Sequence, residues 1–175
     1  MTVSVKKSAD SCGGQYLTCR LGEEQYGIEI LKVREIIGIL PVTPLPHSRD
    51  YILGVINLRG RVIPVANLRT RFGMPFQEMT EEACIIVVEI EEDGGTQTMG
   101  ILVDEVAEVC DVEAERTAAP PRFDNRVDDR CLLGMGRVEG RVIFLLDITQ
   151  VLRDPNSPEY HDADGVAPAS DSLQP

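Results

Sequence analysis

An internal duplication constrains the fold of this 175-residue chain more than any other feature. The segment YGIEILKVREI at 26–36 resembles MGILVDEVAEV at 99–109. The segment GVINLRGRVIPVANL at 54–68 likewise resembles GMGRVEGRVIFLLDI at 134–148. Because both matches occur in the same order, we interpret the chain as two copies of one small β unit. The copies span roughly 16–72 and 84–152, and each is expected to form one barrel.

Each copy has the residue pattern of short β-strands, rich in Val, Ile and Leu. Apolar runs flank GEEQ at 22–25, which predicts a hairpin. Arg59-Gly60 and Glu139-Gly140 separate further β-rich runs, which predicts tight turns with Gly at positive φ. Closed barrels leave no exposed sheet edges, so five short strands per copy favour an all-β fold of two five-stranded barrels.

Short helices and polar segments complete the predicted organisation. Asn67 and Asp147 are each expected to cap a short helix, the first of them reaching Gly73. The proline-rich stretch PVTPLPHSRD at 41–50 predicts an extended loop. Residues 1–14 and the acidic 154–175 have the composition of flexible tails around a body at 15–153.

Apolar runs also bear on location. No run of 18 apolar residues exists, so we expect no membrane insertion. The first residues lack the apolar core of a secretory signal. We therefore expect the protein in the cytoplasm.

Charge is distributed unevenly along the chain. The formal net charge is −12, yet an acid-free stretch carries Arg59, Arg61, Arg69 and Arg71. We interpret these residues as one small basic patch. Between the copies Arg61 matches Arg141, whereas Arg59 matches Glu139, so Arg59 is the better candidate for an interface contact. Because the chain as a whole repels phosphate, nucleic acid is not an expected partner.

The residues favour a binding module over an enzyme. His47 lies in the proline-rich loop and His161 in the predicted tail, and no nucleophile motif or metal-ligand cluster appears. The five cysteines form no CxxC pair and are expected to act as small hydrophobic residues. We expect no catalysis, no metal and no cofactor.

Several stretches closely resemble the CheW family, above all GVINLRG followed by VIPV and LR. The resemblance covers roughly 16–152 in unbroken order. It implies two intertwined five-stranded barrels similar to SH3 barrels. It also implies a non-catalytic chemotaxis adaptor that couples the cytoplasmic tip of chemoreceptors to the regulatory domain of a CheA-type histidine kinase.

The resemblance implies two sets of site residues. A receptor tip would dock in the groove between the barrels, where the matching positions are Ile30, Val33, Glu35 and Arg59. Arg59 would face acidic residues of that tip. An apolar kinase-facing surface would include Ile39, Leu40, Val42 and Gly54, with a second kinase contact near Phe123. Asn67 stands where the family usually has Asp, and either residue can cap the helix.

Two alternatives remain at this stage. A CheW-like adaptor could serve a non-flagellar pathway, such as pilus motility. Small barrels also bind peptides or oligonucleotides. Readers of nucleic acid expose aromatic residues on strands, however, and this chain has only four Phe and four Tyr, mostly outside the predicted strands.

Overall fold

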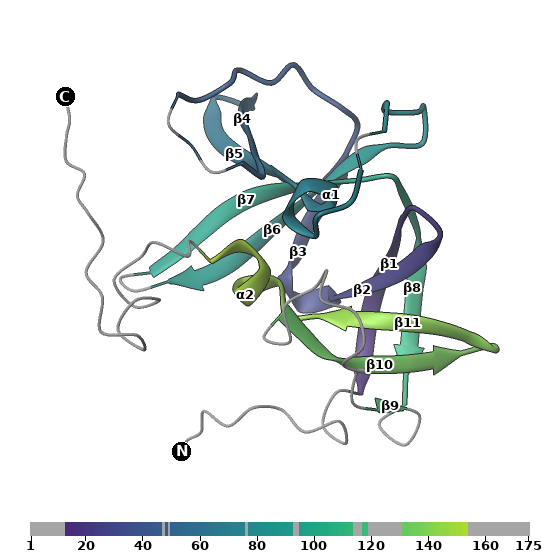
Figure 1. Ribbon diagram of the computed structural model, residues 1–175. Coiled ribbons are helices and arrows are strands. Elements are labelled where there is room, and N and C mark those ends of the chain that lie inside the picture. The colour runs from purple at the N-terminus through teal and green to yellow at the C-terminus, as the bar shows by residue number, and fades with distance from the viewer. Residues whose placement is uncertain are drawn as a thin grey trace, which may run out of the picture.

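The computed structural model consists of two packed β-domains, which confirms the predicted all-β class (Figure 1). It describes residues 13–46, 48, 50–75, 77–92, 95–113, 117–118 and 131–153. The predicted tails lie almost entirely outside these residues. Domain 1 is a five-stranded sheet in the order β3 (Val33–Ile37), β6 (Cys84–Glu92), β7 (Gly95–Val103), β5 (Arg61–Asn67), β4 (Ile52–Leu58).

Domain 2 is a six-stranded sheet whose last strand is only two residues long. Its order is β8 (Glu105–Val112), β1 (Gly14–Leu21), β2 (Glu24–Glu29), β11 (Arg141–Leu146), β10 (Leu132–Val138), β9 (Thr117–Ala118). The described residues also include the short helices η2 (Ile30–Lys32) between β2 and β3, α1 (Leu68–Arg71) between β5 and β6, and α2 (Ile148–Leu152) after β11. Within the described residues, no helix is long and apolar enough to cross a membrane.

The two copies exchange their first hairpins, which corrects the expectation that each contiguous copy forms one barrel. Strands β1 and β2 of the first copy pair with β8 and β11 of the second, and β6 and β7 pair with β3 and β5. Ranges 16–72 and 84–152 therefore delimit the repeats but not the domains.

The short connection after each hairpin explains this exchange. Without the exchange, β3 would pair antiparallel with β1 of its own copy, in the place that β8 takes. It would then run parallel to β2, the strand that directly precedes it. Parallel strands need a crossover of about a dozen residues, and η2 supplies three. The chain therefore continues into the other domain, as it does again at Asp104 between β7 and β8.

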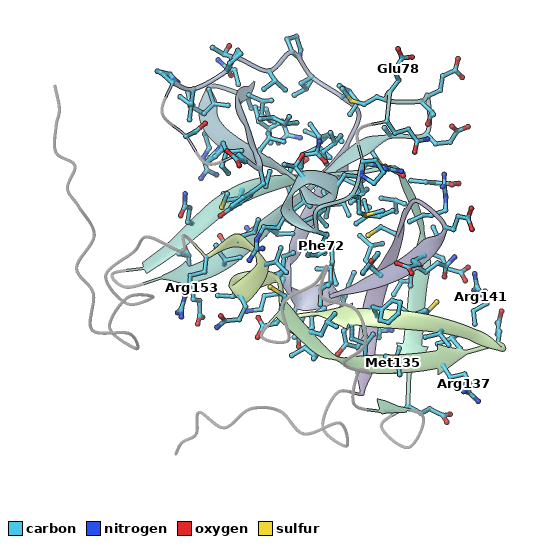
Figure 2. The ribbon with its side chains drawn as sticks, viewed as in Figure 1. Phe72, Glu78, Met135, Arg137, Arg141 and Arg153 are labelled. Atoms are coloured by element: carbon cyan, nitrogen blue, oxygen red, sulfur yellow. The ribbon has the colours of Figure 1, made fainter. Side chains whose placement is uncertain are left out.

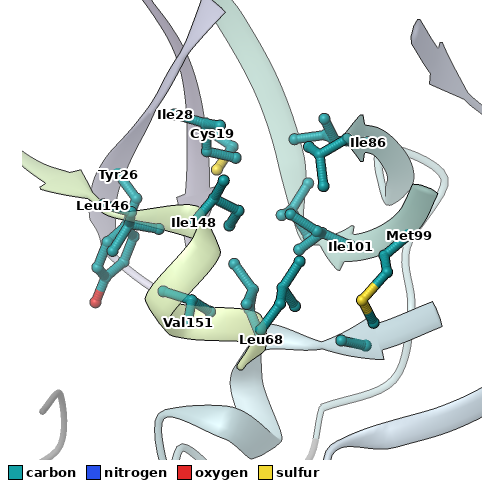
Figure 3. Close-up of a cluster of buried hydrophobic side chains, with 14 of the residues drawn as sticks. Cys19, Tyr26, Ile28, Leu68, Ile86, Met99, Ile101, Leu146, Ile148 and Val151 are labelled. Carbon is teal, nitrogen blue, oxygen red and sulfur yellow. The ribbon is translucent and has the colours of Figure 1, made fainter. Parts of the chain in front are cut away.

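The largest apolar cluster, called the central cluster below, lies between the domains and includes residues of α1 and α2 (Figure 3). Strand β6 contributes Ile86, Val88 and Ile90 to this central cluster, and it turns Ile85 and Val87 into domain 1. Both faces of β6 are therefore buried, which explains its continuous apolar sequence. Burial of this shared surface stabilises the two domains as one unit.

The predicted local structures are present. Arg59 and Gly60 have φ values of 55° and 88°, and Glu139 and Gly140 have values of 53° and 79°, as expected of tight hairpin turns. The Asn67 side chain accepts a hydrogen bond from the Arg69 backbone N–H, so the predicted cap is confirmed. The helix itself ends at Arg71 rather than at Gly73.

The second cap and the cysteines also follow the predictions. The Asp147 side chain accepts a hydrogen bond from the Gln150 backbone N–H. Cys19, Cys110 and Cys131 are buried and form no disulfide. Burial, with a smaller contribution from Cys84 and Asp104, raises the pKa of the Cys19 thiol to about 12. Such a thiol behaves as a small apolar side chain.

Candidate partner-binding surfaces

A groove of about 540 Å³ separates the two domains beside η2. Its walls are the start of β1 and end of β2 in domain 2, helix η2, and parts of β6 and β7 in domain 1. Ile30 lines this groove and packs against the central cluster. Leu31, the next residue, lines it with 93% of its surface exposed. The sequence analysis did not identify Leu31, although its apolar neighbours in EILKV were the available signal.

The other three predicted receptor residues follow η2 along domain 1. Val33 opens β3, pairs with Val88 and packs against the central cluster. Glu35 lies farther along β3, and Arg59 stands on the turn between β4 and β5. None of these three lines the groove itself. The predicted receptor residues thus extend from the groove along β3 to the hairpin turn.

Glu35 and Arg59 form a two-pronged ion pair at the surface. Arg59 Nη1 and Nη2 donate to the two carboxylate oxygens of Glu35 over 2.9 and 2.7 Å. The hydrogen bond from Arg59 lowers the pKa of Glu35 below its usual range. Asn57 steadies the turn, since its side-chain oxygen accepts a hydrogen bond from the Gly60 N–H over 2.8 Å. The pair presents a fixed arrangement of donors and acceptors with no net charge.

The predicted basic patch is absent from the described surface, because the four arginines have partners far away in the sequence. Arg69 is 8% exposed and bonds Asp104. Arg71 donates to the Val151 carbonyl over 2.8 Å and lies 5.4 Å from the centre of the Tyr51 ring.

The remaining two arginines are exposed at the β4–β5 turn, and each has a hydrogen-bond partner. Arg61 reaches the Thr98 hydroxyl over 3.4 Å, and Arg59 is paired with Glu35. An acid-free stretch of sequence therefore does not indicate an unpaired basic surface.

The predicted kinase residues lie on domain 1, beside a second apolar cluster inside that domain that includes Ile56, Ile63 and Val65. Leu40 and Val42 are half-buried and pack against that cluster, and Ile39 is exposed. Ile36 and Leu45 add exposed apolar surface to the same part of the chain. An exposed apolar strip of this kind is typical of a protein interface. Phe123 lies outside the described residues.

Gly54 is buried, so it is not a direct surface contact. It has a φ of 149°, and an added Cβ would lie 2.1 Å from the Thr43 carbonyl oxygen. Thr43 and Val55 exchange two backbone hydrogen bonds at this point, of 2.8 and 2.9 Å. Gly54 therefore holds the apolar strip in place by allowing its backbone to approach β4.

Arg69 and Asp104 form a second, largely buried polar cluster at the junction of the domains. Arg69 Nη2 lies 2.7 Å from Asp104 Oδ2, and Arg69 also donates to the Pro75 carbonyl. Asp104 accepts a further hydrogen bond of 2.8 Å from the Gly22 N–H. These contacts tie α1, the following segment and the β1–β2 turn together.

Comparison with known proteins gives consistent matches over most of the chain. The model of the CheW-like domain matches residues 15–156. The chemotaxis protein CheW of Klebsiella aerogenes is 36% identical over 166 residues, which cover 95% of each chain. The chemotaxis protein CheW of Bacillus subtilis is 29% identical over 157 residues, covering 90% of this chain and 95% of that protein.

A solved structure has the same architecture. The crystal structure of the scaffolding protein TtCheW from Thermoanaerobacter tengcongensis has a TM-score of 0.72 to this chain at 29% identity. The match covers 81% of this chain and 94% of that protein.

Proposed function

The chain belongs to the CheW family of chemotaxis adaptors, and from this premise we propose that it couples chemoreceptor tips to a CheA-type histidine kinase. It acts as a scaffold without catalysis of its own, in the cytoplasm beside membrane-bound receptors. The observation that carries this proposal is the presence of two separate surfaces on one rigid fold. An adaptor needs two such surfaces to hold two partners at once.

The first surface suits a helical receptor tip. The groove beside η2 is open and has exposed Leu31 at its rim. The Glu35–Arg59 pair lies farther along domain 1, between β3 and the β4–β5 turn. Ile30 links the groove to the central cluster, and Val33 packs against the same cluster at the start of β3, so a partner seated there would contact well-packed elements. Preorganised contacts reduce the entropy that binding costs.

The second surface suits the regulatory domain of the kinase. Ile39, Leu40 and Val42 form the apolar strip. Gly54 on β4 contacts the backbone of this segment at Thr43 and so fixes its position. A second kinase contact near Phe123 is part of the same proposal. The strip and the groove involve different residues, so one partner need not displace the other.

Replacing Arg59 by Glu is expected to weaken receptor binding roughly tenfold or more while leaving kinase binding unchanged. The substitution breaks the pair with Glu35 and places two carboxylates side by side. The pair is exposed, so thermal stability should change little. Binding of a receptor-tip fragment and of the kinase regulatory domain, measured separately by calorimetry, checks this expectation.

Arg59→Lys is the matched control, because it keeps the charge but removes the two-pronged geometry. An intermediate loss of affinity is expected. If Arg59→Glu binds the receptor fragment as the wild type does, the Glu35–Arg59 pair is not part of the receptor surface.

A further inference from the structure

The duplication places a second, smaller groove at positions that correspond in part to those of the first. Gly27 pairs with Thr18 in the first hairpin, and Gly100 pairs with Val87 in the second, which sets the correspondence between the copies. Four residues after each glycine, Leu31 therefore corresponds to Asp104. The second groove, of about 320 Å³, shares five lining positions with the first. Its Ala83, Leu102, Val103, Asp104 and Arg20 correspond to Gly14, Glu29, Ile30, Leu31 and Glu89.

The protein's own side chains narrow the second groove. Arg69 extends from α1 into it and pairs with Asp104. Gly73, with a φ of 72°, turns the chain after α1, and the Met74 N–H bonds the Arg69 carbonyl over 2.8 Å. Residues 77–80 then line the same groove, with Gln77 accepting a hydrogen bond from Arg69. Glu78 of this segment is labelled in Figure 2.

Among the residues that the structure describes, none supplies the first groove with these elements. Leu31 stands where the second groove has Asp104, and Thr149 of α2 stands where α1 has Arg69. Arg153, at the end of α2, has extended backbone angles of −67° and 140°, so the chain does not turn there as it does at Gly73. An apolar side chain is left 93% exposed at the rim of an open groove.

We propose that Leu31 is the apolar anchor of the receptor-binding groove, and that the Arg69–Asp104 pair narrows the second groove and makes it polar, so that one adaptor takes one receptor tip. This inference rests on the proposed function and deepens it. It explains how a duplicated fold with two partly corresponding grooves acquires one specific site.

The charges of the open groove indicate the chemistry of its occupant. Its lining includes Glu29, Lys32, Glu89 and Glu91, and the Arg34 guanidinium lies 3.5 Å from the Glu89 carboxylate. A complementary helix would place an apolar side chain against Leu31 and a Lys or Arg toward Glu91. The receptor segment seated here is therefore apolar, with a basic residue at the Glu91 side. This differs from the acidic tip that the sequence alone suggested for Arg59.

The test transfers the Arg69–Asp104 pair from the second groove to the first. The double variant Leu31→Asp/Thr149→Arg places an acid and an arginine at the positions equivalent to Asp104 and Arg69. Leu31→Ala removes only the apolar anchor. Val142→Asp is the control, because Val142 is another exposed apolar residue but lies on the β10–β11 hairpin of domain 2. Arg137 and Arg141 mark that hairpin in Figure 2.

Titration calorimetry with a receptor-tip fragment should give one site per wild-type protein. Leu31→Ala is expected to weaken binding roughly tenfold or more, and the double variant should abolish it, while Val142→Asp binds normally. All variants should still bind the kinase regulatory domain. Two receptor sites on the wild type, or unchanged binding by the double variant, would overturn the inference. If the wild type binds no receptor fragment, the proposed function itself fails.

Discussion

Gly54→Asp is expected to lower the free energy of unfolding by on the order of 3 kcal/mol or more. A Cβ at this position would lie 2.1 Å from the Thr43 oxygen and 2.7 Å from the Thr43 carbonyl carbon, and backbone cannot move aside as a flexible side chain can. The φ of 149° adds strain for any residue with a side chain. A buried carboxylate without a partner adds a further cost.

The same substitution should also weaken kinase binding, but indirectly. The clash pushes the backbone at Thr43 away from β4, and Leu40 and Val42 belong to this segment. The sequence alone placed Gly54 on the kinase-facing surface itself. The structure instead predicts a displaced apolar strip, with faster hydrogen exchange at Thr43 and Val55. Urea unfolding and hydrogen exchange measure the two effects.

Two alanine variants separate the clash from the charge. Gly54→Ala carries no charge and should be destabilised nearly as much as Gly54→Asp. Gly38→Ala is the matched control, since a Cβ there meets no atom within 4 Å, and it should be as stable as the wild type. A fully stable Gly54→Ala variant would show that the backbone contact at Thr43 is not the cause.

Arg69→Ala is expected to cost about 3 kcal/mol of stability, because it leaves Asp104 in a half-buried site without its main partner. The contacts of Arg69 to the Pro75 carbonyl and to Gln77 are lost as well. Arg61→Ala is the control, because Arg61 is exposed and makes one long hydrogen bond. A thermal melt of Arg69→Ala that matches the Arg61→Ala melt would contradict this account.

The pair also predicts sensitivity to acid. Burial alone would raise the pKa of Asp104, but hydrogen bonds from Arg69 and the Gly22 N–H outweigh it and hold the pKa below its usual range. A carboxyl whose pKa is lower in the folded protein stabilises it at neutral pH, and this stabilisation disappears as pH falls through the folded pKa. Asp104→Asn should therefore flatten the loss of stability below about pH 4.

Local features of this fold were predictable from sequence because they depend on neighbouring residues. The turn at Arg59-Gly60 and the caps at Asn67 and Asp147 follow from backbone preferences within a few positions. The duplication indicated the number of similar units.

Long-range pairing was not predictable in the same way. The hairpin exchange depends on the length of η2, whose three residues look like part of a strand in the apolar sequence pattern. The prediction of a basic patch was wrong because the acids that pair with these arginines are distant in sequence. Glu35 lies 24 residues from Arg59, and Asp104 lies 35 residues from Arg69. Leu31 was missed because an apolar residue between strands is ordinarily buried.

The adaptor role itself is tested most directly by reconstituting kinase activity from purified parts. Receptor-containing vesicles and the CheA-type kinase are combined with and without this protein, and kinase autophosphorylation is measured. The account predicts strong activation that requires all three components, is reduced by Arg59→Glu and Gly54→Asp, and is accompanied by no ATP turnover from the protein alone. Full kinase activation by receptors in the absence of this protein, or no change on its addition, would contradict the account.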